Sequence, residues 1–266
     1  MMCGKVTKGS ATALVTGASS GIGLEYARNL AERGYNLIII SRDKENLLNV
    51  RNCLIKEYGI EVWAIDKDLA TLNAAEELFE ILHQRRIDVL INNAGIFSFC
   101  DITDTPVKRI EQIILLHDMT NTKLCRLFAQ KMAQEGGGHI LNMSSYSIWM
   151  PFPGLALYSA SKAYLKSFSV AFAKEVKEKK VYVTAVCPAG IATDLYGLAK
   201  DWQKIGLKIG ALTSPRFCAK RGLNAMFRHE KCIVPDWWWR LFIPLCLLIP
   251  GFVMKLIRKY TKKFQK

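Results

Sequence analysis

The sequence lacks paired cysteines: its eight cysteines include no Cys-x-x-Cys motif, and several of them stand inside apolar runs. That pattern is typical of reduced thiols in the cytoplasm, and a disulfide framework is the weaker alternative in a chain of this length. Residues 1–10 also lack the apolar core of a secretory signal peptide. We therefore expect a cytoplasmic protein that holds no metal.

Internal repeats and low-complexity segments are also absent, as are Pro/Gly/Ser-rich linkers before residue 190. Half of the residues are apolar and 23% are charged, which excludes a disordered, collagenous or coiled-coil chain and fits one globular domain. Lys and Arg outnumber Asp and Glu by 37 to 23, and the resulting net charge of +14 favours an anionic partner. Half of this excess lies in residues 237–266, which contain seven basic residues and no acidic one.

Short apolar runs alternate with stretches of helical periodicity along most of the chain. The predicted strands cover residues 11–16, 35–41, 61–65, 89–92, 138–144 and 181–187. Predicted helices cover 21–33, 43–58, 72–85, 110–134 and 159–179, and another opens at Thr213-Ser214-Pro215. Apolar runs without alternation are typical of strands covered on both faces, so the sequence predicts an α/β fold with a Rossmann-type doubly wound parallel sheet. We expect this single domain to span residues 1–236, with a candidate substrate lid at about 194–213 and an apolar and basic tail at 237–266.

A glycine-rich segment lies directly between the first predicted strand and the first predicted helix. Glycines let the backbone turn tightly and approach a pyrophosphate, while the N–H groups and the dipole of the helix N-terminus stabilise its negative charge. The alternative is an ordinary glycine-rich turn, which the position after a first strand disfavours. The predicted cofactor-binding residues of this segment are Gly17, Ser19, Ser20, Gly21, Ile22 and Gly23.

The end of the second predicted strand indicates which dinucleotide is bound. An NAD-specific site places a carboxylate there, on the ribose 2′-hydroxyl, but this sequence has Ser41 and Arg42. A guanidinium can pair with a 2′-phosphate, so we expect NADPH (NADP) as the cofactor. The alternative is that Arg42 is a solvated loop charge, which the neighbouring Asp43 keeps open. After the third strand, Asp68 and Leu69 are candidates to bracket the adenine.

Three further motifs follow in order. Asn92-Asn93-Ala94-Gly95 closes the fourth predicted strand, Ser145 follows the fifth, and Tyr158-x-x-x-Lys162 begins the next helix. Together with the glycine motif, they make the chain resemble the short-chain dehydrogenase/reductase family from residue 11 to about residue 195. The tail is similar to that of its lipid-ketone reductase branches. The resemblance implies an NAD(P)-dependent oxidoreductase that forms a homo-oligomer, with a cofactor that also contacts Asn93, Ala94 and Gly95.

The chemistry of a ketone reductase explains why these residue types are needed. Tyr158 and Lys162 are four residues apart, hence on one helix face, and an ammonium near the phenol lowers its pKa from about 10 toward neutrality. Tyr158 can then transfer a proton to the carbonyl oxygen, which Ser145 holds by a hydrogen bond as hydride arrives from the nicotinamide. Ser144 points to the other side of its strand. In the resemblance, Lys162 also binds the nicotinamide ribose.

Two positions depart from the family pattern. An asparagine that steadies a relay water is expected fifteen residues before Met132, where the sequence has His117. His117 is therefore a candidate catalytic residue in the relay, or a satisfied structural histidine, and Asn121 one turn on is a partial substitute. The family's Pro-Gly pair is replaced here by Pro-Ala. The nicotinamide-contacting residues that the resemblance implies in this segment are Pro188, Ile191 and Thr193.

The apolar run of the tail is shorter than a transmembrane span. Residues 241–254 are fourteen uncharged residues broken by prolines, whereas a span needs about twenty. Tryptophans precede them and a Lys/Arg cluster follows, which suits peripheral contact with an anionic membrane on its cytoplasmic face. The alternative is a tail packed on the domain or on a partner subunit. Membrane contact favours a lipophilic ketone as the substrate, of ketosteroid, 3-ketosphinganine or 3-oxoacyl type.

Two other functions compete with that of a lipid-ketone reductase. A non-catalytic, dinucleotide-binding regulatory protein of the same fold is compatible with His117, but intact Ser145, Tyr158 and Lys162 disfavour it. A nucleic-acid-binding protein would use the net charge, yet the basic residues flank an apolar segment rather than base-stacking platforms, so we expect no nucleic-acid partner. The residues expected to line the substrate pocket are Tyr146, Trp149, Phe152, Leu155, Tyr196 and Leu198.

Overall fold

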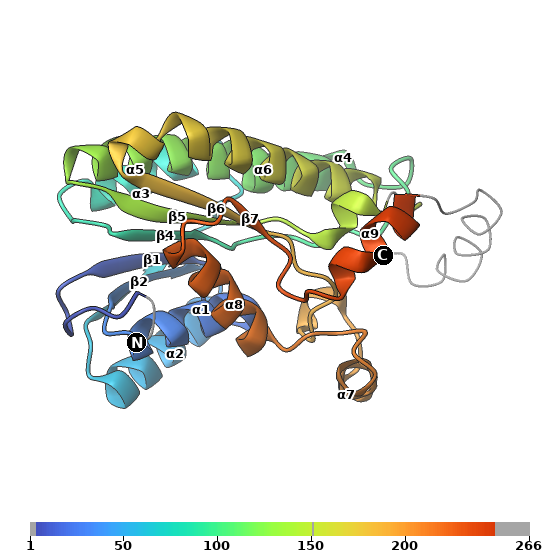
Figure 1. Ribbon diagram of the computed structural model, residues 1–266, viewed down its shortest axis with the longest axis horizontal. Coiled ribbons are helices and arrows are strands. Elements are labelled where there is room, and N and C mark those ends of the chain that lie inside the picture. The colour runs from blue at the N-terminus through green and yellow to red at the C-terminus, as the bar shows by residue number, and fades with distance from the viewer. Residues whose placement is uncertain (1–3, 151, 248–266) are drawn as a thin grey trace.

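The computed structural model describes residues 4–150 and 152–247, and a seven-stranded parallel sheet forms its centre (Figure 1). The strands lie in the order β3-β2-β1-β4-β5-β6-β7. Their bounds are β1 Thr12–Thr16, β2 Asn36–Ser41, β3 Val62–Asp66, β4 Val89–Asn92, β5 Gly138–Met143, β6 Val181–Val186 and β7 Cys232–Ile233. The predicted Rossmann-type doubly wound sheet is confirmed.

Helices cover both faces of this sheet (Figure 1). One face packs against α1 (Gly21–Glu32), α2 (Lys44–Tyr58) and α8 (Pro215–Phe227). The other packs against α3 (Ala74–Leu82), α4 (Val107–Ile114), α5 (Asn121–Gln134) and α6 (Ala156–Glu175). Along β2, Leu37 and Ile39 join the first core while Ile38 and Ile40 join the second, because successive side chains point to opposite faces. This two-sided burial explains why the apolar runs of the sequence do not alternate.

Two elements differ from the sequence prediction. The helix predicted over 110–134 is interrupted by a π-helical segment, η1 (Leu115–Thr120), which lies between α4 and α5. A π segment widens the turn locally, and apolar periodicity alone does not show where it occurs. Strand β7 is missing from the prediction because two residues are too few to give a pattern.

The candidate lid contains a 3₁₀ turn, η4 (Asp194–Tyr196), and helix α7 (Lys200–Lys208). It returns to the body of the protein at Thr213, which pairs with Ile191. The next helix, α8, begins as predicted: the Ser214 hydroxyl accepts a hydrogen bond from the backbone N–H of Phe217 (3.2 Å), and a proline occupies the first helical position.

The first part of the predicted tail packs on the domain. Helix α9 (Trp239–Leu247) begins at Trp239, whose ring lies 5.3 Å from that of Tyr146 and whose carbonyl accepts a hydrogen bond from the Tyr146 hydroxyl (2.8 Å). Residues 248–266 of the tail lie outside the described residues. Among the helices of the described part of the chain, none has the length and apolarity to span a membrane.

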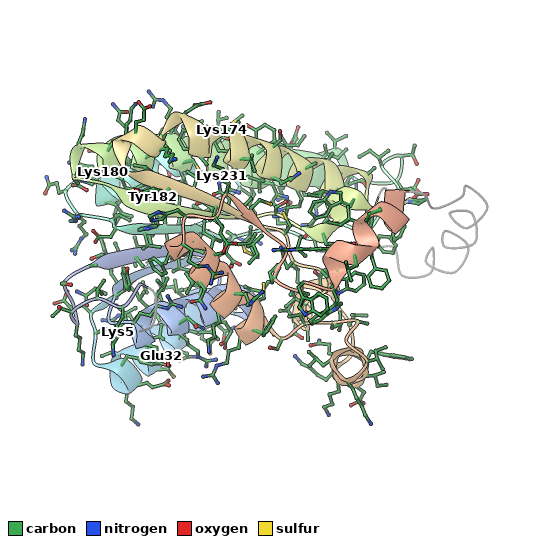
Figure 2. All side chains as sticks on the ribbon, in the orientation of Figure 1. Lys5, Glu32, Lys174, Lys180, Tyr182 and Lys231 are labelled. Carbon is green, nitrogen blue, oxygen red and sulfur yellow. The ribbon has the colours of Figure 1, made fainter. Side chains whose placement is uncertain are left out.

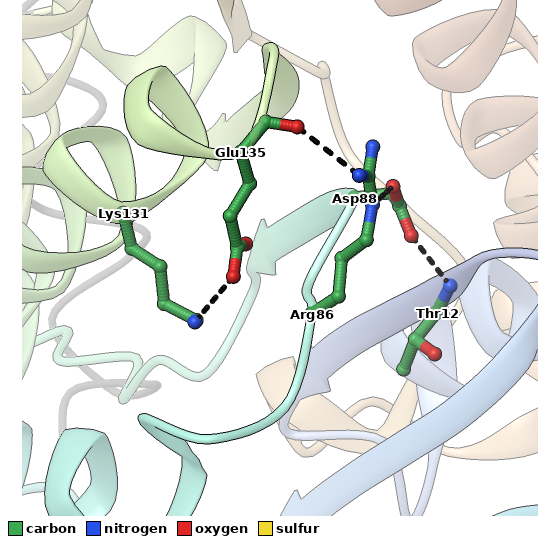
Figure 3. Close-up of polar contacts among 5 residues, drawn as sticks. All are labelled: Thr12, Arg86, Asp88, Lys131 and Glu135. Carbon is green, nitrogen blue, oxygen red and sulfur yellow. Dashed lines mark hydrogen bonds and ion pairs between the residues drawn. The ribbon is translucent and has the colours of Figure 1, made fainter.

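A polar cluster closes the edge of the sheet at which β1 and β4 begin (Figure 3). Arg86 donates to the Asp88 carboxylate (2.7 Å) and to the carbonyl of Glu135, just after α5 (3.1 Å). The other carboxylate oxygen of Asp88 accepts a hydrogen bond from the backbone N–H of Thr12, the first residue of β1 (2.9 Å). These bonds tie the starts of two central strands to the helix layer above them. The opposite edge, where the strands end, carries the predicted site residues.

Candidate active site

A cleft of about 640 Å³ lies at the edge where the parallel strands end. It collects residues that follow β1, β2, β3, β4, β5 and β6, as expected for a doubly wound sheet, whose ligands bind at the carboxyl ends of the strands. Every predicted catalytic or cofactor-binding residue lines the cleft except Gly23 and His117. Those two residues are buried behind its surface.

The loop after β1 and the first turn of α1 each have a position that only glycine allows. Gly17 has a φ of +65°, and a Cβ atom on it would lie 3.0 Å from the Cα atom of Ala94. A Cβ atom on Gly23 would lie only 2.0 Å from the carbonyl oxygen of Gly17. The backbone therefore turns tightly into the N-terminus of α1, where the helix dipole stabilises a bound phosphate. This cradle fits the pyrophosphate of a dinucleotide.

Asn93 fixes the cradle against β4. Its amide nitrogen donates to the carbonyl oxygens of Thr16 (3.0 Å) and Gly17 (3.3 Å). The Thr16 hydroxyl oxygen also accepts hydrogen bonds from the backbone N–H groups of Asn93 (3.0 Å) and Ala94 (2.9 Å). The Asn-Asn-Ala-Gly motif thus shapes the glycine loop in addition to lining the cleft.

Hydroxyl and guanidinium groups gather at the end of β2. The hydroxyl oxygens of Ser19 and Ser41 lie 2.8 Å apart. Arg42 is exposed and makes one long ion pair with Asp68 (3.7 Å), a surface contact weak enough for a phosphate to displace. The carboxylate of Asp43 is engaged in capping α2, where it accepts a hydrogen bond from a backbone N–H. This corner fits a 2′-phosphate.

Tyr158 lies near the start of α6, with 7% of its surface exposed, and lines the cleft together with Ser145. Burial raises the pKa of Tyr158 above its ordinary value, the nearby phenol of Tyr196 raises it further, and the Ser145 hydroxyl lowers it by less. The prediction that Lys162 lowers this pKa toward neutrality is therefore wrong for the protein alone, because desolvation is the larger effect. The phenol stays protonated at neutral pH, which makes it a proton donor.

Lys162 lies next to Tyr158 but points to the strand. Its Nζ atom donates a hydrogen bond to the carbonyl oxygen of Met143, the last residue of β5 (2.9 Å), and lies 5.8 Å from the centre of the Tyr158 ring. Burial lowers the pKa of Lys162 to about 8, and the Asp118 carboxylate opposes that shift. Ser144 donates to the carbonyl oxygen of Lys162 (2.7 Å) and so supports α6.

His117, in the π-helical segment, uses both of its ring nitrogens within the protein. Nε2 accepts a hydrogen bond from the backbone N–H of Ile96 (2.9 Å), which leaves the ring proton on Nδ1 to be donated to the Ser161 hydroxyl (2.9 Å). Ser161 donates in turn to the carbonyl oxygen of Tyr158 (2.9 Å). Burial lowers the pKa of His117 well below its ordinary value, so the ring is neutral.

These contacts correct the predicted relay role of His117. With both nitrogens occupied, the ring has none left for a relay water, and it acts as a positioning residue between the loop after β4 and helix α6. The side chain of Asn121, predicted as its partial substitute, donates to the carbonyl oxygen of His117 (2.9 Å). Both side chains therefore hold the π-helical segment in place.

An aromatic wall stands beside Tyr158. The ring of Phe97 meets the ring of Tyr158 edge-on at 5.1 Å and that of Tyr196 at 4.9 Å. Arg109 donates to the carbonyl oxygen of Phe97 (3.0 Å) and so holds the loop that carries it. An apolar wall next to a proton donor suits a ketone with bulky apolar groups.

The predicted substrate pocket is only partly correct. Tyr196 lines the cleft, whereas Tyr146 and Trp149 lie in a 3₁₀ turn, η2 (Tyr146–Trp149), whose rings pack on each other and, through Tyr146, on α9. They face away from the cleft because the start of the tail covers this side of the protein. The other predicted pocket residues outside the cleft lining are Phe152, Leu155 and Leu198.

The segment after β6 is anchored on both sides. The carbonyl oxygen of Pro188 accepts a hydrogen bond from the backbone N–H of Tyr146 (2.8 Å), and Ile191 pairs with Thr213. Thr193 lies beside the glycine loop, with its Cγ2 atom 3.4 Å from the position of a Cβ atom on Gly21. The predicted nicotinamide floor is thus held rigidly next to the phosphate cradle.

Three residues in or beside the site were not predicted from the sequence. Lys67 lines the cleft between β3 and Asp68, and its position directly after a predicted strand is a signal that could have found it. Phe97 and Asp118 carry no such signal, because their roles depend on contacts across the fold. The pKa of Asp118 is raised to about 6 by burial, against the lowering effect of Lys162.

Comparison with known proteins places this geometry in a family. A family model described as short chain dehydrogenase matches residues 11–204. The chain belongs to the short-chain dehydrogenase family. Members of this family are oxidoreductases, and the catalytic and cofactor ends of the cleft are arranged for that chemistry.

The relatives of this short-chain dehydrogenase include very-long-chain 3-oxoacyl-CoA reductases and a solved structure with NADPH. It is 38% identical to the very-long-chain 3-oxoacyl-CoA reductase of Anas platyrhynchos, over 71% of this chain and 62% of that protein. It is 34% identical to the enzyme of that name in Rattus norvegicus, over 96% of this chain and 83% of that one. The solved short-chain dehydrogenase of Sphingobium yanoikuyae in complex with NADPH is 30% identical, with a TM-score of 0.78 over 87% of this chain and 92% of that chain.

Proposed function

We propose that this short-chain dehydrogenase reduces the ketone of a lipophilic 3-oxoacyl thioester to a secondary alcohol, with NADPH as the reductant. The observation that carries the proposal is the meeting of Ser145 and Tyr158 in one cleft, beside the aromatic wall of Phe97 and Tyr196. The 3-oxoacyl-CoA reductases among its relatives support the thioester class. Ketosteroids and 3-ketosphinganine belong to the same lipophilic class and serve as comparison substrates.

Three residues of the protein have different roles in the proton transfer. Tyr158 is protonated at neutral pH, because burial raises its pKa, and donates its proton to the carbonyl oxygen. Ser145 donates a hydrogen bond to the same oxygen and holds it in place. The ammonium of Lys162, 5.8 Å from the phenol ring, stabilises the negative charge that remains on Tyr158. The bound dinucleotide supplies the hydride.

The preference for NADPH rests on the corner after β2. Ser41 and Arg42 would hold the 2′-phosphate, while Asp68 and Leu69 would lie along the adenine. The pyrophosphate would lie on the glycine cradle at the start of α1. The solved relative in complex with NADPH supports this choice.

We place the protein in the cytoplasm, in peripheral contact with the membrane through residues 237–266. Exposed apolar side chains at the start of this segment support the contact: Trp237, Leu241 and Phe242 have 61%, 70% and 45% of their surface exposed. Such exposure suits an interfacial segment. A membrane-bound reductase meets a long-chain substrate where that substrate is concentrated.

NADPH oxidation with a panel of 3-oxoacyl thioesters, ketosteroids and 3-ketosphinganine tests the proposal. We expect turnover of the thioesters, and we expect Tyr158→Phe to lower kcat by about 100- to 10,000-fold, because the proton donor is lost. Tyr164→Phe is the matched control, since Tyr164 is an exposed phenol on the same helix and should leave kcat unchanged.

The same assay distinguishes the proposed reductase from the alternative function. Tight NADPH binding without turnover of any ketone would favour the dinucleotide-binding regulatory protein. Equal activity of the wild type and Tyr158→Phe would reject the assigned mechanism.

A further inference from the structure

Helix α7 of the lid presents an apolar face that the rest of the described chain leaves uncovered. Trp202, Ile205 and Ile209 have 66%, 48% and 71% of their surface exposed. Their spacing of three and then four residues puts them in one row along the helix. Contiguous exposed apolar side chains of this size mark a surface that binds something apolar.

The other two faces of α7 have different characters. Gln203 and Gly206 are buried against the body of the lid, where Gln203 donates to the carbonyl oxygen of Leu198 (2.9 Å). Lys200, Lys204 and Lys208 recur every fourth residue and form the third face. An apolar row with tryptophan, next to a row of lysines, is the pattern of a helix that lies in a membrane interface.

The carboxylates near these lysines do not prevent the lysines from binding an anionic membrane. Lys200 pairs with Asp194 (2.6 Å) and Lys204 with Asp201 (3.3 Å), and all four side chains are at least 70% exposed. Exposed ion pairs of this kind contribute little energy and exchange readily with other partners.

A second apolar surface lies at the same end of the protein. Figure 1 shows α7 standing away from the sheet, at the end where α9 also lies, and Figure 2 shows side chains projecting around α7. The exposed residues that lead into and begin α9 are Trp237, Leu241 and Phe242. Two separate elements thus offer apolar groups at one end of the molecule.

The net charge at this end of the molecule favours an anionic membrane over a second copy of the chain as its binding partner. The two elements at this end, residues 200–208 and 237–247, contain four Lys and Arg against one acidic residue, a net of +3. Two copies of this end repel each other when they meet face to face, whereas an anionic lipid surface attracts each basic residue near it.

We propose that α7 docks on an anionic lipid bilayer, with Trp202, Ile205 and Ile209 in the interface and its lysines among the lipid phosphates. The helix begins four residues after Tyr196, and both Tyr196 and Lys200, the first residue of the helix, line the cleft. Docking therefore brings the cleft close to the lipid from which a lipophilic ketone comes. This surface is distinct from residues 237–266, and its test does not depend on which ketone is reduced.

Co-sedimentation of the full chain with vesicles measures the contribution of α7. The vesicles are phosphatidylcholine with phosphatidylserine, or phosphatidylcholine alone. We expect Trp202→Gln with Ile209→Gln to lower the partition coefficient on the anionic vesicles by about ten-fold or more, because two apolar anchors are removed. Turnover of a short, water-soluble ketone should not change, since neither residue lines the cleft.

Two controls make the result specific. Ile81→Gln changes an equally apolar residue, 47% exposed on α3, and should leave the partition unchanged. Vesicles of brominated lipid quench tryptophans that enter the bilayer, so replacing Trp202 by Phe should remove a quenched component while binding persists.

Either of two outcomes would overturn the proposal. The first is wild-type partition for the double variant together with the same quenching after Trp202→Phe. The second is a change from dimer to monomer in the double variant with unchanged vesicle binding, which would assign the face to a second copy of the chain.

Discussion

Arg42 is the residue on which the choice between NADPH and NADH depends, since it is the exposed cation beside the two serine hydroxyls. We expect Arg42→Asp to lower kcat/KM with NADPH relative to NADH by about 10- to 100-fold, because a charge-assisted hydrogen bond is replaced by repulsion. Steady-state kinetics with both dinucleotides measures this ratio. Lys44→Asp changes charge equally just outside the cleft and should leave the ratio near that of the wild type.

Lys162 makes the reduction depend on pH. Its pKa in the folded protein is about 8, so the ammonium is present below that pH and is lost above it. We expect kcat/KM for reduction to fall as the pH rises through about 8, because the charge that stabilises ionised Tyr158 disappears. A pH profile shows the inflection, and Lys162→Arg, which keeps its charge, should not show it.

The same group makes folding stability depend on pH in the opposite direction. The folded pKa of about 8 lies below the ordinary value of 10.5, so the unfolded chain binds more protons between these two values, and stability rises with pH across that window. Denaturant unfolding at pH 7 and pH 10 measures the effect. A Lys162→Met variant should lack this rise, since it has no group to titrate.

Single residues of the site were predictable where a motif fixes them along the chain. Ser145, Tyr158 and Lys162 stand at the end of a strand and in the first turns of a helix, so their meeting follows from the order of the elements. Phe97 and Asp118 were not predictable, since nothing near them in the sequence shows that they face Tyr158 and Lys162. The predicted shift in the pKa of Tyr158 had the wrong direction for a similar reason, because burial is a property of the whole fold.

At the scale of elements, the π-helical segment η1 depends on His117. Its ring joins the backbone of Ile96 to Ser161 on α6. We expect His117→Ala to lower the free energy of unfolding by about 1–3 kcal/mol, because the buried N–H of Ile96 loses its acceptor. His117→Asn offers an acceptor of another shape and should recover part of that loss.

Denaturant unfolding and the pH profile of kcat together test the role of this histidine. A positioning residue changes stability and the magnitude of kcat but leaves the inflection near pH 8 in place. Loss of that inflection in His117→Ala would contradict the positioning role and support the relay role that the sequence suggested.

Most elements were predictable because each buried strand is a short apolar run and each covering helix shows its own periodicity. The six longer strands fall within a residue or two of their predicted bounds. The interruption of the helix before Asn121 was not predictable, because a π segment keeps the composition of the helix around it.

At the scale of the whole molecule, the sequence indicated an apolar and basic end but not its construction. Trp239 was grouped with a tail, yet it packs on Tyr146 and belongs to the domain. The exposed row of α7 was hidden in a stretch of mixed polarity, and its meaning comes from the fact that no described neighbour covers it. Burial decides which apolar residues form a core and which form a surface.

The sheet order also governs how the chain reaches its final structure. The first strand made, β1, lies between β2 and β4, and the Asn93 backbone N–H that binds Thr16 is 77 residues away in the sequence. A loop of that length must close before the phosphate cradle exists, which is slower than forming any of the helices. The cradle is therefore completed late in folding, and a chain stopped before β4 leaves one edge of β1 open to aggregation.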